Sequence, residues 1–145
     1  MASAYSLAWD VSLRDRNTFH LDARAHCVAT VRDATALPSL LADPALRNRP
    51  LMVLGAGSNV LFATERFAGC LVHLQCQQAR ISGNDGDHTI VHVDAGFEWD
   101  ALVDWTLDHG LQGLENLALI PGQAGAAPIQ NIGAYGVEVG KFIAA

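Results

Sequence analysis

The sequence has 145 residues, of which 50% are hydrophobic and 17% are charged, and its formal net charge is −6. This length allows one domain with a buried core, or one domain and part of another. No apolar run approaches the roughly 18 residues of a membrane-spanning helix, and the chain begins without the basic and apolar segments of a secretion signal. We therefore predict a cytoplasmic protein that does not bind membranes.

Charge is unevenly distributed along the chain. Residues 1–80 contain eight arginines and six acidic residues, whereas residues 81–145 contain nine acidic residues and a single base, Lys141. Nucleic-acid binding requires clustered Lys and Arg, so this class of partner is excluded. A phosphorylated ligand of the second half would have to be held by backbone amides.

The residues that most often bind metals do not form a site. Cys27, Cys70 and Cys76 contain no C-x-x-C pair, so neither a zinc knuckle nor a redox dithiol is indicated, and we predict reduced, structural thiols. His88 and His92 can share one face of a strand, but no third ligand lies near them in the sequence. No metal site is predicted.

The first half of the chain has the pattern of a β-α-β unit. The first 16 residues are expected to be irregular, and a short strand then covers residues 26–32. A short helix is predicted within residues 33–48. The uninterrupted apolar run over residues 50–62 predicts a strand buried on both faces of a parallel or mixed sheet.

The second half begins with strands. Residues 69–76 and 79–82 have strand character, and N-D-G-D at residues 84–87 predicts a hairpin turn, because Asn, Asp and Gly tolerate positive φ. The returning strand is expected over residues 88–96.

The clearest helix is predicted over residues 98–109. Its apolar stripe consists of Trp99, Leu102, Val103 and Leu107, flanked by Trp105. Asp100, Asp104 and Asp108 repeat every four residues and are expected to face water. Gly110 supplies the C-terminal stop. The chain ends on an apolar segment, KFIAA, with no partner strand after it, which predicts a truncated domain.

The first candidate binding loop is G-A-G-S-N at residues 55–59, directly after the predicted buried strand. Its glycines allow a tight turn and bring backbone N–H groups close to a ligand, so such a nest can bind a diphosphate without a cationic side chain. It is not the dinucleotide-binding G-x-G-x-x-G fingerprint, because Val60 stands at the third glycine position. Alone, a G-x-G turn is weak evidence.

The second candidate loop is PGQAGAAPIQNIGAYG at residues 121–136, which has four glycines, two prolines and no charge. A loop of this length without its own periodicity indicates function. Its small residues would let the backbone lie flat against a planar cofactor ring, with amide dipoles as the polar contacts, or would pack tightly inside a buried loop. Composition leaves both readings open. The residues expected to anchor the loop in a core are Leu117, Leu119, Ile120, Ile129, Ile132 and Tyr135.

Four strings occur in a fixed order: N-T-F at 17–19, G-A-G-S-N-V-L-F at 55–62, G-L-E-N-L-A-L-I-P-G at 113–122 and P-I-Q-N-I-G-A-Y-G at 128–136. Together they resemble the UDP-N-acetylenolpyruvoylglucosamine reductase family (UDP-N-acetylmuramate dehydrogenase) in its longer, type I form. The resemblance covers roughly residues 15–140.

The resemblance implies a flavoenzyme of bacterial cell-wall synthesis, in which NADPH reduces bound FAD and hydride then passes to the enolpyruvyl ether of the UDP-sugar substrate. The implied fold is α+β, the vanillyl-alcohol-oxidase/PCMH-type FAD-binding fold, which binds the dinucleotide between two α+β subdomains. Residues 17–68 would form the first subdomain and residues 69–145 an incomplete second one, with the substrate domain absent.

The resemblance also implies FAD-binding residues. Gly55, Ala56, Gly57, Ser58 and Asn59 would cradle the pyrophosphate, and Pro121, Gly122, Gly125, Ala126, Ala127, Ile129, Asn131 and Gly133 would pack on the flavin side. Tyr135 would lie near flavin or substrate, or simply pack. Ala126 and Ala127 stand where the family often has serines, and each lost hydroxyl contact would cost about 0.5–1.5 kcal/mol.

No catalytic residue is assigned to this chain. The family's serine–glutamate proton donor and its substrate-binding tyrosine and arginine belong to a later domain, and Ser82, Glu115 and Glu138 occur in the wrong motifs. The chain alone is expected to be inactive and monomeric. The alternatives are a non-functional truncated fragment and the FAD-binding module of another oxidoreductase of the same fold.

Overall fold

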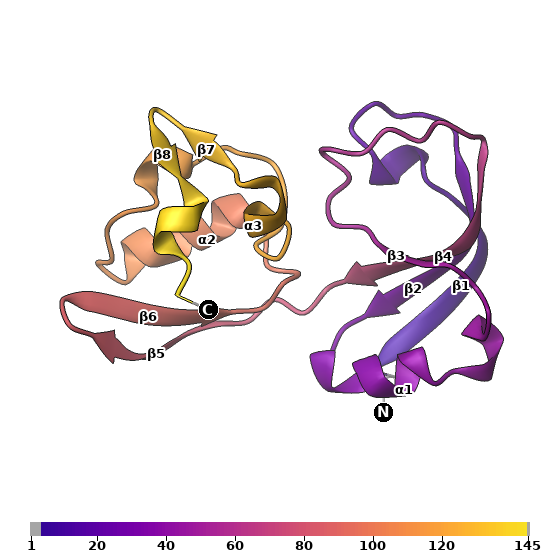
Figure 1. Ribbon diagram of the computed structural model, residues 1–145, viewed down its shortest axis with the longest axis horizontal. Helices are drawn as coiled ribbons and strands as arrows, with labels where there is room; N and C mark the ends of the chain where they lie inside the picture. The colour runs from indigo at the N-terminus through magenta and orange to yellow at the C-terminus, as the bar shows by residue number, and fades with distance from the viewer. Residues whose placement is uncertain (1–3, 145) are drawn as a thin grey trace. The chain divides into compact units, whose positions relative to one another are not determined.

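The structure is a computed structural model that describes residues 4–144 (Figure 1). The chain divides into two compact units, which meet in the sequence between Cys76 and Gln77. Each unit combines strands with short helices, as the α+β prediction requires.

The first unit is built on a mixed four-stranded sheet in the order β1-β2-β4-β3. Its strands are β1 (Tyr5–Ser12), β2 (Arg24–Val31), β3 (Leu51–Val53) and β4 (Arg66–Leu74). β1 runs antiparallel to β2, whereas β2 and β3 both run parallel to β4. The prediction of a parallel or mixed sheet is confirmed.

The expectation that the first 16 residues are irregular is wrong for residues 5–12, and residues 1–3 lie outside the described range. Residues 5–12 form β1, which pairs with β2 from Tyr5↔Val31 to Ser12↔Arg24. β1 is an edge strand whose sequence, YSLAWDVS, alternates large apolar residues with small or polar ones, and Tyr5, Leu7 and Val11 are its half-buried members. The local pattern of a half-buried strand was therefore present in the sequence and was overlooked.

The expected boundary between residues 68 and 69 is also corrected. β4 spans this position and lies between β2 and β3, so residues 69–76 belong to the first unit. A strand in the middle of a sheet cannot be assigned to another unit without breaking both of its ladders.

The apolar run over residues 50–62 is not one doubly buried strand. Only Leu51–Val53 form β3, an edge strand in which Val53 is 69% exposed. The rest of the run leaves the sheet, and Leu54, Val60 and Phe62 pack into the core beneath the second face of the sheet. The run is apolar after β3 because these loop residues pack against the sheet and cover its apolar side chains.

The other face of the sheet is covered by the helical connection after β2. It consists of η2 (Ala34–Ala36), α1 (Leu37–Leu41) and η3 (Pro44–Leu46), and it places Leu40 and Leu46 in the core. The predicted helix is thus present as three short turns.

The three cysteines are buried free thiols of the first unit. Cys27 and Cys70 lie opposite each other on β2 and β4. Burial, followed by the hydrogen bond with Cys70, raises the pKa of Cys27 to about 12. A thiol with this pKa is protonated at neutral pH and unreactive, as a structural cysteine should be.

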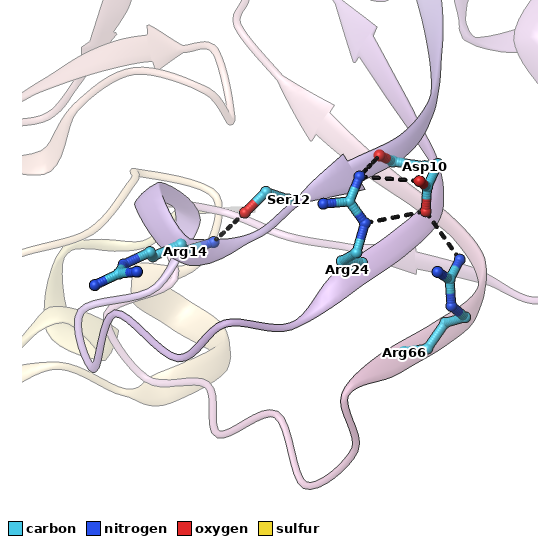
Figure 2. Close-up of polar contacts among 5 residues, drawn as sticks. All are labelled: Asp10, Ser12, Arg14, Arg24 and Arg66. Atoms are coloured by element: carbon cyan, nitrogen blue, oxygen red, sulfur yellow. Dashed lines mark hydrogen bonds and ion pairs between the residues drawn. The ribbon is translucent and has the colours of Figure 1, made fainter.

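A cluster of charged residues joins one end of β1, β2 and β4 (Figure 2). Arg24 Nε and Nη2 donate to the Asp10 carboxylate at 3.1 and 3.0 Å, and Nη2 also donates to the Asp10 carbonyl. Arg66 Nη1 donates to the same carboxylate at 2.9 Å. These contacts hold the pKa of Asp10 below its ordinary value, chiefly through the hydrogen bonds from the two arginines. Next to the cluster, the Arg14 backbone N–H, at the start of η1 (Arg14–Arg16), donates to Ser12 Oγ at 3.3 Å.

The second unit begins with a two-stranded hairpin, β5 (Ala79–Asp85) and β6 (His88–Val93). Gly86 in the turn has φ +58°. The predicted N-D-G-D turn and both strands are confirmed.

The helix α2 (Trp99–Asp108) is confirmed within one residue at each end. It ends in a Schellman motif, in which Leu111 N donates to Thr106 O and Gly110 N to Leu107 O, with Gly110 at φ +70°. Leu107 is 48% exposed and does not belong to the buried stripe, which Thr106 completes instead. A short polar side chain can take this place because its Oγ1 donates to Val103 O at 2.7 Å.

The remaining elements of the second unit are short. They are η4 (Glu115–Leu117), α3 (Ala127–Gln130), the hairpin β7 (Gly133–Ala134) and β8 (Val137–Glu138), and η5 (Val139–Phe142). Together with α2 they enclose a core that includes Trp99 and Leu117.

Candidate functional site

The first candidate loop is positioned by β3 and by the connection between β1 and β2. Gly57 has φ +70° and is buried, and a Cβ there would lie 2.0 Å from Arg16 O. Its carbonyl accepts a hydrogen bond from Thr18 N at 3.3 Å. Only glycine fits this position, because of both the backbone conformation and the close approach to Arg16.

The loop presents several unused backbone donors. Within residues 4–144, no hydrogen-bond partner is found for the backbone N–H groups of Gly55, Ala56, Gly57 and Asn59. Leaving a buried donor such as that of Gly57 unsatisfied costs about 1–3 kcal/mol. No charged side chain occurs between residues 55 and 62. The loop therefore offers a neutral cradle of amides that suits an anion.

The second candidate loop is held by residues 95–99. Trp99 N donates to Gly122 O at 3.1 Å, and Gly125 N donates to Ala95 O at 2.9 Å. A Cβ on Gly125 would lie 2.5 Å from the Ala95 Cβ, so this contact requires glycine.

The backbone amides of the second loop differ from those of the first. The N–H groups of residues 124–127 all donate within the chain, to carbonyls of Ala95, Phe97, Gln123 and Ala124. The expectation that amide dipoles of this loop supply the polar contacts is therefore wrong for these four residues. Small side chains and carbonyls remain as its contact surface.

The predicted residues differ in exposure. Those exposed are Ala56, Asn59, Pro121, Ile129, Asn131, Gly133 and Tyr135; those half-buried are Gly55, Ser58, Gly122, Gly125 and Ala126; those buried are Gly57 and Ala127. Each loop lies within its own unit, the first in residues 1–76 and the second in residues 77–145.

The expected anchoring of the second loop is half right. Leu117 is fully buried, and Ile120 and Ile132 pack partly into the core. Leu119, Ile129 and Tyr135 are instead 84%, 86% and 91% exposed. The loop is thus fixed by hydrogen bonds and by part of its apolar residues, and it leaves the others at the surface.

Tyr135 stands at the tip of a two-residue turn between β7 and β8. Tyr135 and Gly136 have φ +52° and +79°, as in a type I′ turn. Gly suits such a conformation, but a tyrosine in it is unusual. The simple packing role considered for Tyr135 is excluded within its own unit by its exposure.

Polar residues that the sequence reasoning missed hold this loop in place. Asp100 Oδ1 accepts from Leu119 N at 2.7 Å, so this aspartate does not simply face water. Buried Gln123 donates from Nε2 to Gly96 O at 3.2 Å. The available signal for Gln123 was its position as the one amide side chain among the small residues of PGQAGAA at 121–127.

Two hollows of the second unit border the second loop. Pro121, Gly122, Ala126 and Ala127 line a recess of about 10 Å³, the size of one water molecule. An open groove of about 1200 Å³ extends over β6 and α2, and of the predicted residues only Gly125 lines it.

The structure describes no metal centre or membrane span. In residues 4–144, no group of three or more His, Cys, Asp or Glu side chains is arranged to hold a metal ion, and His88 and His92 are both exposed. No helix in the described range has the length and apolarity to span a bilayer.

Comparison with known protein families assigns a family to this chain. The family described as FAD binding domain matches residues 25–144, and the chain belongs to it.

Curated relatives point to one group of enzymes. The chain is 49% identical, over 147 aligned positions that cover 99% of it, to UDP-N-acetylenolpyruvoylglucosamine reductase of Xanthomonas euvesicatoria pv. vesicatoria. It is 51% identical over 131 positions to the reductase of the same name from Xanthomonas oryzae pv. oryzae.

A solved structure supports the same relation. UDP-N-acetylenolpyruvylglucosamine reductase from Thermus caldophilus superimposes with a TM-score of 0.71 and 29% sequence identity, covering 92% of this chain and 45% of that one. The chain spans 42% of the length of the Xanthomonas euvesicatoria relative. The resemblance read from the four strings is thereby confirmed.

Proposed function

We propose that this chain binds FAD and constitutes the FAD-binding part of a reductase that acts on UDP-N-acetylenolpyruvoylglucosamine, forming UDP-N-acetylmuramate for peptidoglycan synthesis. The observation that carries the proposal is the neutral amide cradle at residues 55–59, in a chain of the FAD binding domain family. A sequence identity of 49% to a reductase of that name supports the substrate class.

The residues of the first loop fit the pyrophosphate of FAD. The N–H groups of Gly55, Ala56, Gly57 and Asn59 would donate to phosphate oxygens, and glycine at 57 leaves the backbone accessible. Since backbone dipoles provide the positive end of each contact, no lysine or arginine is needed.

The second loop would meet the flavin. Its contact residues in this proposal are Pro121, Gly122, Gly125, Ala126, Ala127, Ile129, Asn131, Gly133 and Tyr135. Small side chains permit close approach of a flat ring, and the exposed Ile129 and Tyr135 provide apolar surface that a ring would cover. When bound, FAD supplies hydride transfer between NADPH and the enolpyruvyl double bond of the substrate.

Catalytic groups are assigned to the part of the reductases that this chain does not span. Ser82 and Glu115 are both exposed and hydrogen-bonded to nearby backbone. Ser82 Oγ donates to Ile90 O across the β5–β6 hairpin at 3.2 Å, and Glu115 Oε2 accepts from Gly113 N at 2.8 Å. Neither residue is part of the two candidate loops that would hold the cofactor. We therefore expect FAD binding without turnover of the UDP-sugar, in the cytoplasm, by a monomer.

Two other functions rank below this one. If the chain were a non-functional fragment, the four backbone N–H groups of the first loop would have no ligand to bind, and their lack of partners would be unexplained. An FAD-binding module of another oxidoreductase would share the cradle. However, the relatives that are 49% and 51% identical to this chain are both named UDP-N-acetylenolpyruvoylglucosamine reductase, which favours that activity.

A direct titration tests the proposal. FAD fluorescence should be quenched on adding the chain, with saturation at micromolar concentration. Gly57→Ala should weaken binding at least tenfold, because the added Cβ collides with Arg16 O. Gly83→Ala is the matched control, since a Cβ at Gly83 meets nothing within 4 Å. Absence of quenching at tens of micromolar cofactor, with the chain folded by circular dichroism, would contradict FAD binding.

A further inference from the structure

The N-T-F segment at residues 17–19 has no role in the function proposed above, although it lies against the first loop. Asn17 is 3% exposed and comes from the connection between β1 and β2. Its Nδ2 donates to Leu13 O at 2.7 Å and to Leu21 O at 3.2 Å, and its Oδ1 accepts from Leu21 N at 3.0 Å. One side chain therefore fastens both ends of residues 13–21.

The fastened segment is the surface on which Gly57 rests. A Cβ on Gly57 would lie 2.0 Å from Arg16 O and 3.0 Å from the Asn17 Cα, and Thr18 N donates to Gly57 O. The backbone on both sides of the Asn17 side chain thus contacts the central residue of the amide cradle. A shift of residues 16–18 would displace the Gly57 peptide.

We propose that Asn17 is a positioning residue for the cofactor cradle: its side-chain amide holds residues 13–21 in the conformation that directs the N–H groups of the 55–59 loop toward one anion. The inference rests on the proposed FAD binding and adds the residue that sets the geometry of the pyrophosphate contacts. Asn17 itself does not touch the ligand, because both of its N–H bonds are used on Leu13 O and Leu21 O.

The chemistry of this position requires an amide. Aspartate has the same shape but, when ionised, donates nothing and would face two carbonyl oxygens. Alanine would leave the carbonyls of Leu13 and Leu21 without this donor. Each replacement leaves every residue that would touch FAD unchanged, so an effect on affinity would have to pass through the 13–21 segment.

The experiment compares Asn17→Asp with Asn84→Asp, the same substitution at an exposed asparagine of β5. Binding of FAD and of riboflavin, which lacks the pyrophosphate, is measured by fluorescence at a temperature at which circular dichroism shows each variant folded. We expect Asn17→Asp to weaken FAD binding about tenfold or more, to leave riboflavin binding within twofold, and Asn84→Asp to change neither. Unchanged FAD affinity in folded Asn17→Asp, or an equal loss for both ligands, would overturn the proposal.

Hydrogen–deuterium exchange on the unmodified chain tests the same idea if Asn17→Asp fails to fold. FAD should slow exchange in residues 13–21 together with residues 55–62, since the two segments move as one. Protection confined to residues 55–62 would overturn the positioning role. Failure of the unmodified chain to bind FAD would instead remove the proposed function, and this inference with it.

Discussion

At the scale of the single residue, Tyr135 combines an unfavourable backbone conformation with an exposed side chain. The residue occupies the first central position of the β7–β8 turn at φ +52°, and its ring is 91% exposed. A left-handed conformation costs a residue with a Cβ about 1–2 kcal/mol. Nothing in its own unit covers the ring, so packing there does not offset this cost.

Replacing Tyr135 by asparagine should therefore stabilise the second unit. Asn-Gly is the preferred pair for a type I′ turn, and we expect the free energy of unfolding to rise by about 0.5–1 kcal/mol. For a unit of this size, that corresponds to a higher Tm by roughly 2–8 °C, measured by circular dichroism without ligand. A lower Tm would show that the tyrosine ring packs against the chain after all.

The same variant should bind FAD more weakly if the ring covers the flavin as proposed.

At the scale of the element, the Asp10 cluster links three strands through one carboxylate. The ordinary pKa of an aspartate is 3.8, and hydrogen bonds from Arg24 and Arg66 lower it in the folded chain. The cluster therefore contributes stability above the unfolded pKa, and this contribution is lost as pH falls through the lowered folded pKa. Asp10→Asn should reduce the urea midpoint at pH 7 and should have a smaller effect at pH 3, below the ordinary pKa of 3.8.

The measurement uses urea unfolding followed by tryptophan fluorescence, to which Trp9, next to Asp10 on β1, contributes. Asp15→Asn is the control, since it removes an exposed aspartate that lies outside the cluster. An equal loss of stability at both pH values, or the same loss in Asp15→Asn, would rule out the ion pairs as its source.

The elements that the sequence predicted well are those whose determinants are local. The β5–β6 turn and the end of α2 depend on Gly86 and Gly110, and both were recognised. The alternation in YSLAWDVS marks β1 as well but was overlooked, whereas the shortness of β3 is set by its pairing with β4 and does not follow from its own residues. The binding loops were found as motifs, but the exposure of Ile129 and the supporting role of Asn17 follow only from the three-dimensional packing.

At the scale of the whole molecule, the two units carry different charge. Residues up to Cys76 contain seven arginines and six acidic residues, whereas residues from Gln77 onward contain nine acidic residues with Arg80 and Lys141 as bases. The second unit therefore has a formal net charge of −7 and repels itself, while the first is nearly neutral and includes the ion pairs of Asp10.

Salt should consequently affect the Tm of the two units differently. Raising NaCl from about 0.05 M to about 0.5 M shortens the screening length from roughly 14 to 4 Å, which weakens both repulsion and exposed ion pairs. We expect the Tm of the second unit to rise and that of the first to stay constant or fall slightly. The tryptophans separate the signals, because Trp9→Phe leaves only Trp99 and Trp105, which report on the second unit. A Tm that moves the same way in both units would mean that net charge does not govern the response of the second unit.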